Sequence, residues 1–142
     1  MTIDLPSFSA CDALVSVMVA VSVSDGNIRT SELVAIERMV NHMPAFANYD
    51  VDRIRAVSQT VASLFEEEDG LDALFGLVHD SLPERLYETA YALACDVAAA
   101  DGRLTDAEAE MLREIRHQLD VSRLHAAAIE LSAQLRHRTL QP

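Results

Sequence analysis

Apolar positions recur with helical spacing along most of the chain. They fall three or four residues apart over 51–67, over 106–119, after Gly70 and from Leu124 to Leu135. This spacing gathers apolar side chains on one face of an α-helix. Breaks at Met43-Pro44, Asp69-Gly70, Ser81 to Pro83 and Asp120 separate the segments. The pattern predicts an all-α, single compact bundle of about seven helices with short connections.

A short motif occurs twice, 76 residues apart. Asp25-Gly26-Asn27-Ile28 is followed by Glu32, and Asp101-Gly102-Arg103-Leu104 is followed by Glu108. Apolar residues stand four and seven positions beyond each glutamate. The motif therefore reads D-G-x-[IL]-x-x-x-E and predicts an internal duplication, helix–Asp-Gly–helix twice. We expect one domain over residues 1–142, with repeat halves at about 5–67 and 82–138.

The segment before the first motif gives a conflicting signal. Valines at positions 15, 17, 19, 21 and 23 alternate with smaller or polar residues, which is the period of a β-strand. Its repeat partner, Tyr87 to Ala100, is rich in alanine and leucine, which favour helices. Because equivalent segments of a duplication share one structure, we predict a helix in both, with the valine-rich copy buried on most sides.

Two four-residue patterns predict helix starts. Ser81-Leu82-Pro83-Glu84 and Thr105 to Glu108 each place a hydroxyl residue three positions before a glutamate, as in a capping box. Pro83 suits an early helical position. We therefore expect helices to begin at both places.

Composition narrows the possible functions. Asp and Glu number 23 against 11 basic residues, for a net charge of −12. This balance repels nucleic acid and favours cations or basic partners. The apolar run Ala13 to Val23 is about half the ~20 residues that span a bilayer, and no basic residue precedes it. We expect a cytoplasmic protein without direct membrane insertion.

Enzyme signatures are missing from the sequence. Four glycines form no P-loop or GxGxxG, no GxSxG occurs, and the two cysteines form no CxxC. We therefore expect no catalytic residues, no organic cofactor and no enzymatic activity.

The Asp-Gly corners resemble the second half of an EF-hand calcium loop. With Gly26 at position six, Ile28 falls at eight and Glu32 at twelve. Positions one and three are then Val21 and Val23, whose hydrocarbon side chains do not coordinate calcium. Neither corner is a working EF-hand.

Two interpretations of the corners remain. In the first, Asp-Gly is a turn and the glutamate caps the next helix, with no ligand. In the second, the corners bring four carboxylates together into a hard-cation site for calcium or magnesium rather than zinc. The four residues are Asp25, Glu32, Asp101 and Glu108.

The doubled corner after an apolar helix resembles the tellurite-resistance TerB family, from about Leu5 to Leu135. The resemblance implies about seven helices and an acidic cluster proposed to bind divalent metal. It also implies a role in tellurite resistance or wider stress responses, with a protein partner in membrane-associated complexes. By position, the acidic residues are Asp25, Glu32, Asp101 and Glu108, with a second tier on the preceding helices: Asp12, Glu88 and Asp96. Asp96 aligns with Ala20, so the two halves are not equally acidic.

A second function fits the same sequence. The chain could be a helical protein–protein interaction domain with structural corners and no metal. An exposed apolar patch would then mark the binding surface. Met43, Phe46 and Tyr49 are the candidates for that patch.

Overall fold

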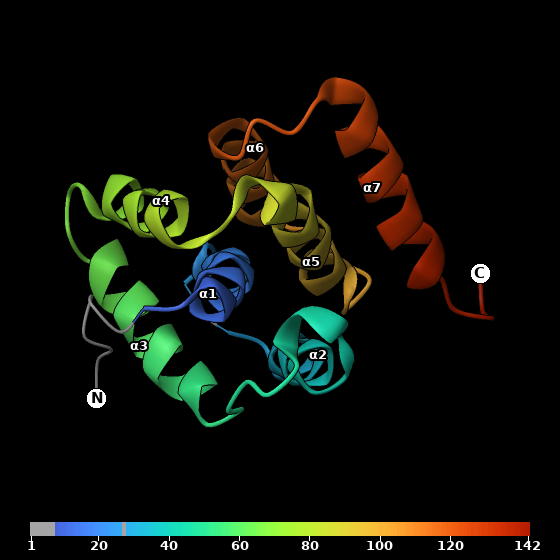
Figure 1. The fold of residues 1–142 in the computed structure, drawn as a ribbon. Helices are drawn as coiled ribbons and strands as arrows, with labels where there is room; N and C mark the ends of the chain where they lie inside the picture. Colours follow the sequence, from blue (N-terminus) through green and yellow to red (C-terminus); the bar gives the residue numbers. More distant parts are fainter. Residues whose placement is uncertain (1–7, 27) are drawn as a thin grey trace.

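The computed structural model describes residues 8–26 and 28–142, and over these residues the chain is helical with no strand. Seven α-helices and two short 3-10 helices follow one another (Figure 1). This confirms the predicted all-α class. The elements are α1 (Ala10–Val23), α2 (Thr30–His42), η2 (Pro44–Phe46), α3 (Arg53–Phe65), α4 (Gly70–Ser81), η3 (Glu84–Leu86), α5 (Tyr87–Ala99), α6 (Asp106–Gln118) and α7 (Arg123–Arg136).

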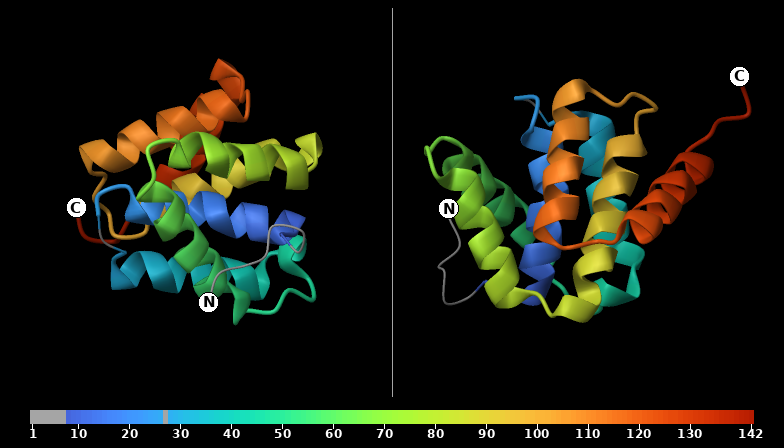
Figure 2. Two further views of the ribbon diagram at one scale, coloured as in Figure 1. Left: turned by 90° about the vertical axis from the view of Figure 1, so that its left-hand side faces the viewer. Right: turned by 90° about the horizontal axis from the view of Figure 1, so that it is seen from above.

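Helix α1 forms the centre of the bundle. It contacts α2, α3, α4, α5 and α6, and every residue from Asp12 to Ser22 is buried. The views in Figure 2 show these helices packed around it. A helix enclosed on all sides needs apolar residues on every face, so the alternating valines fit without forming a strand. The helix predicted for this segment is confirmed.

The predicted helix starts had different outcomes. At Thr105 the capping box is present: the Glu108 backbone N–H donates to Thr105 Oγ1 at 3.1 Å, and the Thr105 N–H donates to Glu108 Oε1 at 2.9 Å. The helix start predicted at Ser81 is wrong. Ser81 ends α4, and α5 begins only at Tyr87, after an extended link and η3. Pro83 explains the difference, because a proline forces the preceding residue out of the helical conformation.

The apolar patch predicted after α2 is also wrong. Phe46 is buried, with 3% of its surface exposed, and its ring contacts that of Tyr49. Tyr49 is half-buried, and its hydroxyl donates to Asp12. Of the three predicted residues, Met43 alone is exposed. The segment therefore covers the core rather than offering a binding surface.

Both Asp-Gly corners have the same backbone form. Gly26 has φ of 97° and Gly102 has φ of 74°, a left-handed conformation that glycine adopts at little cost. The N–H of Gly26 donates to Val23 O at 3.0 Å, and that of Gly102 donates to Ala99 O at 3.1 Å. The shared geometry agrees with a duplication, which itself stays a prediction.

None of the helices in the part of the chain described here combines the length and apolar character needed to cross a bilayer.

Candidate functional site

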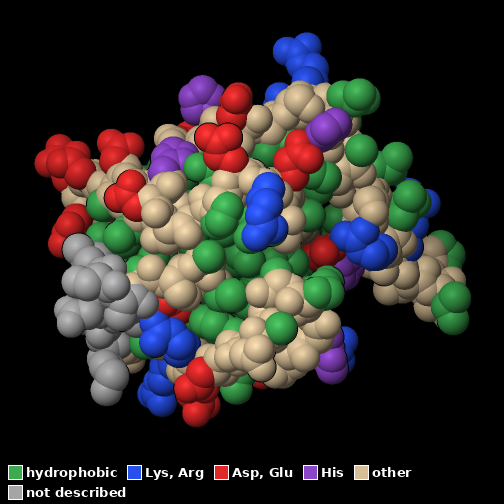
Figure 3. All heavy atoms as spheres, viewed as in Figure 1, with side chains coloured by type: hydrophobic (Ala, Val, Ile, Leu, Met, Phe, Trp, Pro, Cys, Tyr) green, Lys and Arg blue, Asp and Glu red, His purple; other side chains and the backbone are tan. Residues whose placement is uncertain are grey.

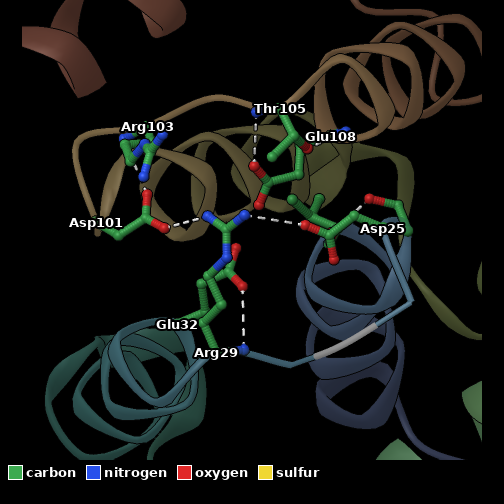
Figure 4. A network of polar contacts seen from close by, with 9 residues as sticks. Asp25, Arg29, Glu32, Asp101, Arg103, Thr105 and Glu108 are labelled. Carbon is green, nitrogen blue, oxygen red and sulfur yellow. Dashed lines mark hydrogen bonds and ion pairs between the residues drawn. The ribbon is translucent and has the colours of Figure 1, made fainter.

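The two corners meet on either side of one arginine (Figure 4). Arg29 stands at the start of α2, and its Nη1 forms an ion pair with Asp101 Oδ2 of the second corner. Its Nη2 lies 3.3 Å from Asp25 Oδ2 of the first corner. The arginine therefore joins segments 72 residues apart in the sequence. Glu32 and Glu108 lie beside the same guanidinium (Figure 4).

The two glutamates are buried completely, with 0% exposure for each residue. Each uses one carboxylate oxygen as a helix cap. Glu32 Oε1 accepts from the Arg29 backbone N–H at 3.4 Å, and Glu108 Oε1 accepts from the Thr105 N–H at 2.9 Å. The other oxygen of each, Oε2, is buried and has no hydrogen-bond partner among the described residues. Such orphaned buried oxygens are rare, because the lost hydration costs free energy.

Burial and proximity change the acidity of this pair. Burial raises the pKa of Glu32 to about 8, and the hydrogen bond and charge of Glu108 act in the same direction. Two carboxylates sharing a dry site do not both ionise readily. The raised pKa of Glu32 therefore favours a proton shared between the two carboxylates, whose unpartnered oxygens otherwise lack a donor.

Asp101 behaves in the opposite way. Its burial would raise its pKa, but the Arg103 backbone N–H, at 2.9 Å from Oδ1, and the Arg29 guanidinium hold that pKa below its usual value. The two aspartates at the junction are thus ion-paired with Arg29, whereas neither glutamate forms an ion pair with a residue that the structure describes.

Sequence reasoning missed Arg29. Its position corresponds in the repeat to Thr105, which caps α6 with its hydroxyl. Arg29 instead directs its side chain across the junction to Asp101. The two repeats therefore differ at this cap position, with an arginine in the first and a threonine in the second. This difference is visible in the sequence, and it marks Arg29 as the residue that breaks the symmetry of the repeats.

The second-tier acids lie elsewhere. Glu88 pairs with His125, with 2.6 Å between Oε2 and Nδ1. Asp96 lies 2.5 Å from Arg136 Nη2 and 3.4 Å from His137 Nε2. Each of these acids is held by a basic side chain of α7 or of the residue that follows it, so neither joins the corner group.

Asp12 is fully buried near the start of α1, about 20 Å along the helix from Asp25. It accepts from Tyr49 Oη at 2.5 Å, from Arg53 Nη2 at 2.6 Å and from the Ser9 N–H at 2.9 Å. Burial would raise the pKa of Asp12, but these hydrogen bonds lower it below the usual value. Its oxygens are fully used in joining α1 to α3.

The arrangement of the corner carboxylates determines how they could coordinate a metal ion. Among the described residues, no three His, Cys, Asp or Glu side chains are arranged to hold a metal ion. The reason is visible in Figure 4: Asp25 and Asp101 turn toward Arg29 rather than toward the glutamates. The donors present are nonetheless carboxylate oxygens, two of them orphaned, which is the chemistry that calcium and magnesium take.

One protein-family model matches the chain. The family described as tellurite resistance protein TerB matches residues 11–131, which include both corners, five of the seven helices in full and most of the other two. No curated protein and no solved structure matches the chain. Since the match covers most of its length, the chain belongs to the TerB family.

Proposed function

We propose that this protein is a TerB-type stress-response module, of the tellurite-resistance kind, that binds a divalent cation at the junction of its two corners. Glu32 and Glu108 would be the inner ligands, with Asp25 and Asp101 beside them. Calcium or magnesium fits an all-oxygen donor set better than zinc does.

One observation carries this proposal. Each buried glutamate spends one oxygen on a helix cap and leaves the other, Oε2, without a donor. A purely structural cap needs only the first oxygen. Two such oxygens from different halves of the chain, both fully buried, need a shared proton or a cation, and a cation between the corners would satisfy both.

Cation binding at the Glu32–Glu108 pair would require changes in the residues of the junction. Glu32 must give up its proton, because metal ligands bind as carboxylates. Arg29 must release Asp25 and Asp101 if these also become ligands. A bound cation would supply two positive charges to neutralise the buried carboxylates of Glu32 on α2 and Glu108 on α6.

Thermal unfolding after chelation tests the proposal, with calcium, magnesium or manganese added back separately. A ligand that binds only the folded state contributes about 2.7 kcal/mol at a hundredfold excess over its Kd. We expect one of the metals to raise the Tm by several degrees.

Matched variants locate the effect. Glu32→Gln/Glu108→Gln keeps both caps, since glutamine also serves in capping boxes, and removes both ionisable groups. Glu66→Gln/Glu67→Gln makes the same charge change on the exposed α3–α4 turn. The shift should vanish in the first variant and persist in the second. A shift of equal size in both variants, or no shift with any metal, contradicts the proposal and leaves the corners as turns and caps.

A further inference from the structure

A groove of about 760 Å³ lies between α5, α6 and α7. Its base is formed by α5, where Tyr91 and Cys95 are buried and Ala98 and Ala99 follow. Helix α7 packs on α5 but diverges from α6, as the right-hand view of Figure 2 shows. Because the facing side chains include several alanines, the three helices leave a channel with an apolar floor.

The outer face of α7 carries further apolar residues, two of them next in sequence to the groove-lining positions 130 and 134. Leu124, Leu131 and Leu135 are spaced seven and four residues apart, which places them on one side of the helix. They are 76%, 53% and 51% exposed. The residues that α7 buries against the bundle are only alanines, at positions 126 and 133. The three leucines of α7 therefore face outward, whereas Ile129 is partly buried and packs against the core.

The charge of this surface is opposite to that of the whole protein. Four arginines line the groove, and its only acidic residue, Glu130, accepts a hydrogen bond from Tyr91. Three of these arginines form no ion pair with any residue that the structure describes: Arg103, Arg116 and Arg138. Figure 3 shows apolar and basic side chains on the side formed by α7, while acidic ones gather at the opposite edge of the molecule.

We propose that this groove and the adjoining leucine face bind an acidic amphipathic helix of a partner protein. An apolar channel between helices accepts the apolar stripe of a further helix. The basic rim selects acidic flanks, because like charges across an interface cost several kcal/mol and opposite charges fix its register. A second copy of this chain is a poor occupant, since two basic rims would face each other. This surface borders the second corner, since Gly102 and Arg103 line the groove, but it includes none of the four corner carboxylates, and peptide binding there requires no cation.

Two synthetic peptides of about 20 residues test the proposal. Both carry leucine at helical i, i+3, i+4 and i+7 positions; one has glutamate at the remaining positions and the other lysine. Fluorescence anisotropy measures binding of each to the full chain. The overall charge of −12 would favour the lysine peptide, whereas the groove favours the glutamate peptide. We expect the glutamate peptide to bind at least about tenfold more tightly, with the preference weakening in high salt.

Surface variants place the binding site. Arg116→Glu/Arg138→Glu should weaken glutamate-peptide binding by about tenfold or more. The same reversal at exposed arginines of α2 and α3, Arg38→Glu/Arg55→Glu, should leave it unchanged. Leu131→Gln/Leu135→Gln should also weaken binding, while Leu33→Gln on α2 should not. All these positions are exposed except Arg116, which is partly buried, and circular dichroism verifies that each variant folds.

Several outcomes would overturn the proposal. They are equal or tighter binding of the lysine peptide, no binding of the glutamate peptide, and equal effects of the groove and control variants. Self-association through the leucine face, seen by sedimentation and lost in Leu131→Gln/Leu135→Gln, would replace the partner helix with a second copy. Binding to phosphatidylglycerol vesicles without binding to the glutamate peptide would replace it with an anionic lipid surface.

Discussion

Buried carboxylates lie near both ends of helix α1, and the pKa values of Asp12 and Glu32 are shifted in opposite directions. Near its start, Asp12 has its oxygens occupied by Tyr49, Arg53 and the Ser9 N–H, and its pKa is lowered. Near its end, Glu32 faces Glu108 with one oxygen of each unpartnered, and burial raises the pKa of Glu32 to about 8. All three carboxylates are 0% exposed.

The difference separates a structural acid from a candidate binding site. A buried carboxylate whose oxygens all accept hydrogen bonds stabilises the ionised form and holds neighbouring helices together. A buried pair with orphaned oxygens costs stability unless a proton or a cation is shared between them. The burial of a carboxylate therefore indicates less about its function than the hydrogen-bond partners of its two oxygens.

The largest effect expected of a single substitution concerns the structural end. Asp12→Ala removes the carboxylate that accepts hydrogen bonds from Arg53 and Tyr49. It should lower the free energy of unfolding by about 2 to 3 kcal/mol. The loss is smaller than for a fully buried pair because the Arg53 side chain is 35% exposed. Urea unfolding measures this. Asp80→Ala, at an exposed position of α4, should change it by less than about 0.5 kcal/mol. A similar loss of unfolding free energy in both variants would contradict a structural role of Asp12 in joining α1 to α3.

The pH dependence of stability should differ between the two ends. Glu32 has a folded pKa above its unfolded value, so its contribution is complete below about pH 4.5 and is lost as the pH rises through about 8. The free energy of unfolding should therefore fall across this range by up to about 1.4 kcal/mol per pH unit, the limit for one proton. Asp12 and Asp101 contribute in the opposite sense, since their lowered pKa values make stability fall only as the medium becomes strongly acidic.

Glu32→Gln separates these contributions. The amide holds no titrating proton, so the decline of stability toward pH 8 should flatten while the acid-side loss remains. Urea unfolding at several pH values checks both limbs. An unchanged decline in Glu32→Gln would mean that Glu32 ionises at its ordinary pKa.

Arg29 should compete with any cation at the junction. Arg29→Gln removes the positive charge held between Asp25 and Asp101, so the apparent affinity for calcium or magnesium should rise by about tenfold, or about 1.4 kcal/mol. Metal titration followed by Tm or by calorimetry measures the change. Arg103→Gln, beside the same corner but without an ion pair to a described residue, serves as the control. Weaker metal binding in Arg29→Gln would instead make the arginine an aid to binding.

The smallest expected effect concerns the turns themselves. Gly102→Ala meets no atom within 4 Å, so its cost comes only from the positive φ and should be about 1 kcal/mol. Gly76→Ala, equally free of neighbours but inside α4, should stabilise by a similar amount. Thermal unfolding of both variants tests the sign. Stabilisation by Gly102→Ala would remove the argument that the corner needs glycine.

Much of the fold could be predicted from the sequence because its signals are local. Helical spacing, the Thr105 cap and the doubled Asp-Gly corner each depend on residues within a few positions, and the repeat settled the valine-rich helix. The Ser81 start was mispredicted because Pro83 forced an extended link that a four-residue pattern does not contain.

The chemistry of the site was only partly predictable. The repeat predicted the four corner carboxylates. It did not predict that each glutamate uses one oxygen as a cap and leaves the other unpartnered, because this depends on packing between α2 and α6. Arg29 reaches an acid 72 residues away, and Arg53 reaches one 41 residues away. Such pairings depend on how helices pack, which spacing along one sequence does not encode. The cation, the protein partner and the cytoplasmic location stay predictions.

Isothermal titration of the chelated protein with calcium and with magnesium tests the central claim most directly. Runs near neutral pH in two buffers of different ionisation enthalpy count the protons released on binding. The account predicts saturable binding of one of these metals, with release of up to about one proton from Glu32, and loss of binding in Glu32→Gln/Glu108→Gln but not in Glu66→Gln/Glu67→Gln. No saturable heat with either metal in either buffer, or unchanged binding in the first variant, would contradict it.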